Sequence, residues 1–178
     1  MAGKQVKRSG IESVRAELAV RKVESFRLDA LASFSGYTAG DPFAQAVVVT
    51  GRPVAEGEDL LEDASIAAIA KALVAMGYRK KPLFAIALSA AAPDAGELER
   101  RKASLRPLIE LVDPISVIAV DGISSDAVRA AFALPGDARG HVRKLGRSIV
   151  LLDDFEAALA DETKKREAWH QLKHLALR

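Results

Sequence analysis

Residues 51–63, GRPVAEGEDLLED, gather carboxylates behind one arginine, Arg52, and contain no Ser, Cys or His. The carboxylates of this segment are Glu56, Glu58, Asp59, Glu62 and Asp63. With no other acid–base group present, the chemistry open to the segment is water activation by a carboxylate. Glu56 and Glu58 are therefore the candidate catalytic residues.

Further acidic residues follow the other apolar runs that we expect to be strands. In an open α/β sheet, ligands bind beyond the carboxyl ends of the strands. The candidate binding residues at this edge are Gly51, Arg52, Pro53, Asp59, Asp121, Gly122, Asp153 and Asp154.

Two other interpretations of these acids stay open. Acidic side chains are favourable at helix N-termini, which would explain Glu62, Asp63 and Asp126 as capping or first-turn residues. Alternatively, Asp59, Asp121 and Asp153 would hold Mg²⁺ in a phosphate-processing enzyme, although the sequence has no P-loop.

The elements that position these residues alternate between strands and helices. Near-continuous apolar runs predict buried strands, and longer segments with helical spacing predict the helices between them. The strands are expected at residues 46–50, 83–88, 114–120 and 148–152. The helices are expected at 65–76, at 97–112 and from about 124, with one or two more over 154–175. Pro107 is expected to kink or split its helix, and residues 135–147 to form a long loop or a hairpin. This pattern predicts a three-layer α/β/α fold with a mostly parallel four-stranded sheet.

Length and composition indicate one domain. The 178 residues, 49% of them hydrophobic with a net charge of +2, are enough for a single core spanning residues 1–178. Within it we expect a flexible start (1–9), an N-terminal helical segment (10–34) and a core (43–175). The absence of cysteine excludes thiolate sites and disulfides. We expect no cofactor, no membrane association and a cytoplasmic protein.

Three segments, in order, resemble the uracil-DNA glycosylase superfamily. VVVTGRPVAEGED (47–59) stands where the family has its first motif, SLRPLIELVDPISVIAVDGISSDAVRAAF (104–132) resembles a helix–strand–turn–helix segment, and residues 148–175 resemble the closing segment. Together they cover about residues 43–175, and the resemblance implies that fold for the core.

The same resemblance implies that the family's catalytic groups are missing. Gly51 stands where the family has the acidic or amide residue that positions water, while Pro53 is retained. No aromatic residue lies between Phe43 and Tyr78 to stack a flipped base, and Asp153-Asp154 replaces a histidine dipeptide. The expectation is a bacterial DNA-repair-like pseudoenzyme that binds a protein or nucleic-acid partner. The alternatives are an active atypical glycosylase that uses Glu56 or Glu58, and a clamp-loader accessory subunit.

Basic residues supply the candidate partner surface. They precede two of the expected strands, as Arg79, Lys80 and Lys81 and as Arg139, Arg143, Lys144 and Arg147. DNA binding needs Lys and Arg against phosphates, so the acidic strand-end edge has the wrong sign for it. A solvated face is the alternative reading of the basic residues. His141, His170 and His174 are expected at the surface or in packing, and Trp169 in the core with Leu172 or in a partner contact.

Overall fold

The computed structural model describes the chain except residues 1–2, 33, 35–36, 56, 91–95 and 178, with side chains from residue 17 onward. The chain divides into two units, Met1–Ser33 and Phe34–Arg178. The first unit consists of helix α1, Gly3–Ala32, which starts earlier than the expected helical segment. Among the helices described, none has the length and apolar character needed to cross a bilayer.

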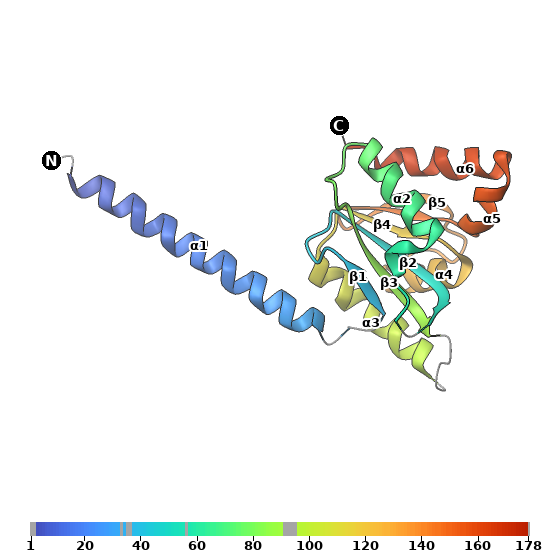
Figure 1. Ribbon diagram of the computed structural model, residues 1–178, viewed down its shortest axis with the longest axis horizontal. Helices are drawn as coiled ribbons and strands as arrows, with labels where there is room; N and C mark the ends of the chain where they lie inside the picture. Colours follow the sequence, from blue (N-terminus) through green and yellow to red (C-terminus); the bar gives the residue numbers. More distant parts are fainter. Residues whose placement is uncertain (1–2, 33, 35–36, 56, 91–95, 178) are drawn as a thin grey trace. The chain divides into compact units, whose positions relative to one another are not determined.

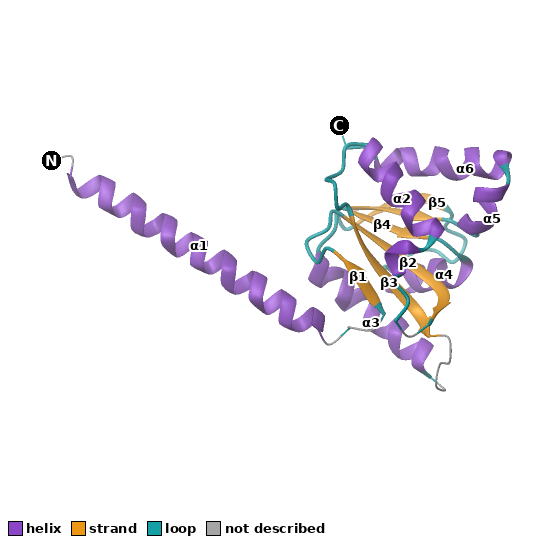
Figure 2. Cartoon of the chain, in the orientation of Figure 1, coloured by secondary structure: helices purple, strands orange, loops and turns teal. Residues whose placement is uncertain are grey.

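The second unit contains a six-stranded mixed sheet (Figures 1 and 2). Its strands are β1 (Thr38–Gly40), β2 (Ala46–Val54), β3 (Leu83–Ala90), β4 (Ser116–Ala119), β5 (Gly140–Lys144) and β6 (Arg147–Leu151). They lie in the order β1-β3-β2-β4-β6-β5. The predicted strands all form, as β2, β3, β4 and β6, and each pairs in parallel with its neighbour among them.

The expectation of four strands was too low because both edges of the sheet carry an antiparallel strand. β1 pairs with β3 over only three residues. β5 pairs with β6 as a hairpin whose turn, Leu145-Gly146, has φ of 52° and 79°. Positive φ at both central residues matches the twist of a two-residue hairpin. The polar sequence of β5, GHVRK, lacks the apolar run that identified the other strands.

Helices cover both faces of the sheet because its central strands are buried on both sides. One face packs against α2 (Ala64–Ala75), α5 (Phe155–Ala160) and α6 (Glu162–Leu172), through Val48, Ile69 and Leu172 among others. On the other side lie α3 (Glu97–Val112) and α4 (Gly122–Ala131), which contact β3, β2 and β4. Two 3₁₀ helices, η1 (Leu60–Glu62) and η2 (Lys173–Leu175), flank α2 and α6.

Helix α3 is continuous through Pro107, so the expected split does not occur. A proline inside a helix cannot bond the carbonyl four residues earlier, here that of Ala103. Both residues are exposed, and a solvent-facing carbonyl can bond to water instead. The buried side of the helix, with Leu105, Leu108 and Ile109, is therefore undisturbed.

Candidate functional site

A crevice of about 410 Å³ lies at the carboxyl ends of β2, β4 and β6. After β2 the chain first adds β3 on one side and then β4 on the other, so the gap between β2 and β4 is where the strand order reverses. Such switch points are the usual ligand sites of open α/β sheets. The crevice brings together seven of the eight residues that the sequence predicted for binding, namely Gly51, Arg52, Pro53, Asp121, Gly122, Asp153 and Asp154.

Asp121 is the central carboxylate of the crevice, and its oxygens bond to the protein itself. It accepts hydrogen bonds from the Thr50 hydroxyl at 3.1 Å and from the Gly51 N–H at 2.7 Å. It also accepts the Ser124 N–H at 2.8 Å and so caps α4. Asp121 therefore joins the carboxyl half of β2 to the start of α4. Helix α4 begins at Gly122 rather than near residue 124.

Gly51 has no room for a side chain. A Cβ at this position would lie 2.4 Å from the Ile123 Cβ and 2.7 Å from the Asp121 Oδ1. Contacts this short require the backbone or α4 to move. The volume that a side chain at position 51 would need is thus occupied by Ile123 and Asp121.

Arg52 and Glu58 form an ion pair at the rim of the crevice. The Arg52 guanidinium lies 2.5 Å from Glu58 and 3.1 Å from Asp63. The hydrogen bond from Arg52, followed by that from the Ala55 N–H, lowers the pKa of Glu58 below its ordinary value. The hydrogen bond to Glu58 raises the pKa of Arg52. A general base works best with a pKa near the working pH, so this pairing makes Glu58 a weaker base.

The capping interpretation holds for several acids of this edge. Asp59 accepts the Leu61 N–H at the start of η1, and Asp63 accepts the Ser65 and Ile66 N–H groups at the start of α2. Asp154 caps α5 through the Ala157 N–H. Asp153 instead lies 3.7 Å from the Arg139 guanidinium. Asp59 is not among the residues that line the crevice, and Glu56 lies outside the described residues.

The magnesium alternative required a convergence of carboxylates. In the described part of the chain, no group of three or more His, Asp or Glu side chains is arranged to hold a metal ion. Asp121 and Asp154 do lie in neighbouring backbone segments, joined by an isolated β-bridge, but each of these carboxylates caps a helix.

The predicted basic surface is divided by the β5–β6 hairpin. β5 runs antiparallel to β6. Residues 139–147 therefore run from the end of the sheet where the parallel strands finish to the end where they begin. Arg139 thus lies beside Asp153 at the acidic edge. Arg147 does not lie on a basic surface: it is buried and bonds to the Pro114 carbonyl, Glu110 and Asp113. Arg79, Lys80 and Lys81 are exposed before β3.

The three histidines of the chain form a cluster that sequence reasoning did not find. His141 on β5 stacks on His174 with ring centroids 4.9 Å apart, and His170 meets His174 edge-on at 5.6 Å. Burial, then the nearby His174 and Arg143, lowers the pKa of His141. The spacing of His170 and His174 placed those two on one helix face, but no local signal in the sequence pointed to β5.

No protein-family model matches the chain, and no curated protein matches it.

Proposed function

We propose that this chain is a uracil-DNA glycosylase-like domain without glycosylase activity, which works by binding a protein partner. The observation that carries the proposal is the packing at Gly51. A water-positioning carboxylate or amide has no space there, because Ile123 and Asp121 occupy the volume that its Cβ would need.

The electrostatics of the crevice support the same proposal. A departing base carries negative charge, and Asp121, Asp153 and Asp154 at the crevice would repel it. Asp153 has a side chain 74% exposed and Arg139 as its partner at 3.7 Å, so its charge faces solvent. DNA phosphates would meet the same repulsion.

The lining of the crevice lacks a stacking surface. Among the described residues that form it, none is aromatic, whereas enzymes that flip a base stack it between aromatic or apolar side chains. The apolar contribution comes chiefly from Pro53, Val120 and Ile123. A protein that binds a partner needs neither a stacking platform nor a general base.

Base excision on defined oligonucleotides tests the proposal. The substrates are duplex and single-stranded DNA containing uracil, hypoxanthine or xanthine, and the readout is strand cleavage at abasic sites. The variants are Glu56→Gln, Glu58→Gln and Asp121→Asn, with Glu62→Gln, an exposed acid of η1, as the matched control.

We expect no excision by the wild-type protein. Excision that Glu56→Gln, Glu58→Gln or Asp121→Asn abolishes and Glu62→Gln preserves would contradict the proposal. It would place the chemistry in the loop after β2 for Glu56 or Glu58, or at the start of α4 for Asp121, and make the chain an atypical glycosylase.

A further inference from the structure

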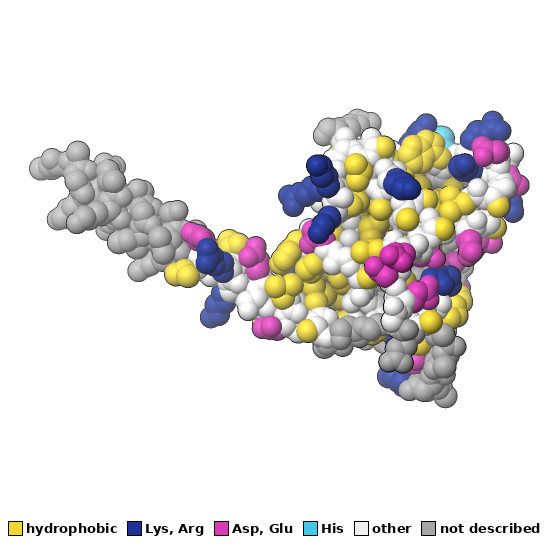
Figure 3. All heavy atoms as spheres, in the orientation of Figure 1, with side chains coloured by type: hydrophobic (Ala, Val, Ile, Leu, Met, Phe, Trp, Pro, Cys, Tyr) yellow, Lys and Arg dark blue, Asp and Glu magenta, His cyan; other side chains and the backbone are white. Residues whose placement is uncertain are grey.

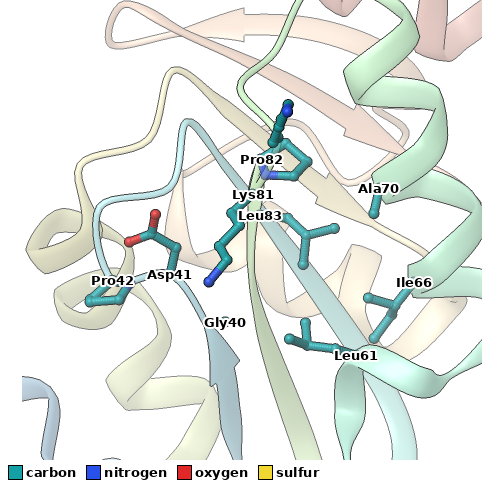
Figure 4. A pocket seen from close by; sticks show the side chains of 10 residues that line it. Gly40, Asp41, Pro42, Leu61, Ile66, Ala70, Lys81, Pro82 and Leu83 are labelled. Carbon is teal, nitrogen blue, oxygen red and sulfur yellow. The ribbon is translucent and has the colours of Figure 1, made fainter.

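A second concavity, of about 700 Å³, lies between the end of β1, η1, α2 and the start of β3 (Figure 4). We call it the β1–α2 groove. Its lining includes Leu61, Ile66, Ala70, Lys80, Lys81 and Leu83. None of the described residues that line it also lines the crevice at the strand ends. What binds in one need not disturb the other.

One wall of the groove is apolar. Leu61, Ile66 and Ala70 stand on the same side in Figure 4, across the gap from Asp41, Pro42 and Lys81. Leu61 is 36% exposed although it is a large apolar side chain. Ile66 and Leu83 are almost fully buried and make the floor continuous with the core. An incoming apolar side chain would remove Leu61 from water.

The opposite rim carries positive charge. Lys80 and Lys81 are exposed, and neither forms a salt bridge within the described part of the chain. Arg79, also exposed, precedes them. Asp41, the one acid among the described lining residues, accepts the Phe43 N–H at 2.9 Å. Figure 3 shows apolar side chains on this face of the molecule with Lys and Arg side chains beside them.

An edge strand of the sheet, β1, adjoins the groove. β1 is the first strand in the sheet order and pairs only with β3 within the described residues. It bonds to β3 through alternate residues, and the backbone groups of the others point away from the sheet. An extended peptide can hydrogen-bond to such an edge while its side chains enter neighbouring pockets. A compact small molecule would leave this edge unused.

We propose that the β1–α2 groove binds a linear segment of a partner protein in which acidic residues flank apolar anchor side chains. The apolar anchors fill the space beside Leu61 and Ala70, and the acidic residues meet Lys80 and Lys81. The inference rests on the proposed protein-binding function and names the chemistry of the partner.

Selection of a random peptide phage library on the immobilised full-length chain tests this inference. Peptides enriched by selection are then synthesised with a fluorescein label, and their binding is measured by fluorescence anisotropy. The variants are the double substitution Lys80→Glu/Lys81→Glu, which reverses the rim charge, and Ala70→Arg, which fills the groove. Lys71→Glu is the matched control, because Lys71 is exposed on α2 but outside the groove. Thermal unfolding verifies that each variant is folded.

We expect enrichment of peptides that combine Asp or Glu with Leu, Ile or Phe. Both groove variants should weaken binding by at least about tenfold, as expected for loss of a charged or an anchoring contact. Lys71→Glu should leave it within about twofold, as rim charges away from the contact act weakly.

Two results would overturn the inference. One is that no acidic–apolar peptides are enriched, or that the enriched peptides bind the folded groove variants as tightly as the wild type. The other is that single-stranded DNA binds the chain and is lost in Lys80→Glu/Lys81→Glu, which would make the rim a nucleic-acid contact. Either result would show that the β1–α2 groove does not bind an acidic–apolar segment. If base excision is still absent, the proposal that the chain lacks glycosylase activity is unaffected.

Discussion

At the scale of single residues, four of the acids after the strands bond to backbone N–H groups at helix starts. Asp59, Asp63, Asp121 and Asp154 each accept at least one such bond at a helix start. A carboxylate there stabilises the helix by satisfying free donors and by favourable interaction with the helix dipole. For these four acids, the acidic character of the edge follows from where helices begin, whereas Glu58 and Asp153 pair with arginines.

Gly51→Ala should destabilise the protein. The added Cβ would lie 2.4 Å from Ile123, and overpacking of this kind lowers the free energy of unfolding by about 1–3 kcal/mol. Gly122→Ala is the matched control, since a Cβ at Gly122 meets nothing within 4 Å. Urea unfolding measures both. Equal stability of the two variants would show that α4 can shift away from β2 at little cost. It would contradict the conclusion that position 51 has no room for a side chain.

His141 should make stability depend on pH. Its pKa in the folded protein is lowered from 6.5 by burial, His174 and Arg143. Below pH 6.5 the unfolded chain therefore binds this proton more readily than the folded one. The contribution of the neutral His141 to the free energy of unfolding is therefore complete above pH 6.5. It is lost as the pH falls toward the folded-state pKa of His141.

Unfolding free energies measured between neutral and acidic pH test this dependence. His141→Gln should flatten the decline, whereas His170→Gln, a change at an exposed ring, should preserve it. An unchanged decline in His141→Gln would assign the pH dependence to other groups.

At the scale of elements, the β5–β6 hairpin separates residues that are close in sequence. It places Arg139 at the acidic edge and buries Arg147 at the start of β6. It also brings His141 against His174 beside α6. The basic run of the sequence is thus distributed over three different environments.

Arg147→Met should lower the free energy of unfolding, because Arg147 connects the start of β6 to the end of α3 and to the segment before β4. Arg147 bonds to Asp113 at 2.7 Å, to Glu110 at 3.0 Å and to the Pro114 carbonyl at 3.1 Å. Losing hydrogen bonds to charged groups costs about 1.5–3 kcal/mol, and exposed acids limit the loss because water can solvate them. Arg143→Met, a change at an exposed residue of β5, should alter the free energy of unfolding by less than about 0.5 kcal/mol. Similar effects of the two substitutions in urea unfolding would contradict the anchoring role.

In helix α6, two adjacent positions differ in burial because they lie on different sides of the helix. Ala168 and Leu172, four residues apart, are buried, while Trp169 is 37% exposed. A step of one residue turns a helix by about 100°. Of the two expectations for Trp169, the core position is wrong, and a partner contact stays a prediction.

At the scale of the whole molecule, the two units differ in how they are stabilised. Phe34–Arg178 contains the six described strands and the clustered core. In α1 several apolar side chains, such as Leu18, Val23 and Phe26, are exposed, and the ion pair between Arg21 and Glu17 is a surface one. Surface pairs of this spacing contribute little.

A chain of residues 34–178 should therefore fold without α1. Its thermal unfolding midpoint should lie within about 4 °C of the full chain's, the shift that about 1 kcal/mol produces at this size. Circular dichroism measures the transition, and amide NMR dispersion verifies the packed core. Loss of a cooperative transition in the shorter chain would show that α1 contributes to the core.

Local sequence was sufficient for the central architecture. Runs such as residues 46–50 and 83–88 predicted the parallel strands, because burial on both faces demands apolar side chains at successive positions. The rule that ligands gather at strand ends then predicted Gly51, Arg52, Asp121 and Asp153 as neighbours, and they line one crevice. Their role in binding stays a prediction.

Tertiary structure alone decided what these residues contact. Whether Gly51 has space, whether Asp121 is free and whether Arg147 is exposed all depend on segments distant in sequence, Ile123, Thr50 and Glu110 among them. The edge strands, the histidine cluster and the β1–α2 groove arise in the same way, from pairings between distant segments. The hydrophobic periodicity of a segment indicates which of its side chains face the core. The contacts between segments depend instead on the order and direction in which the fold places them.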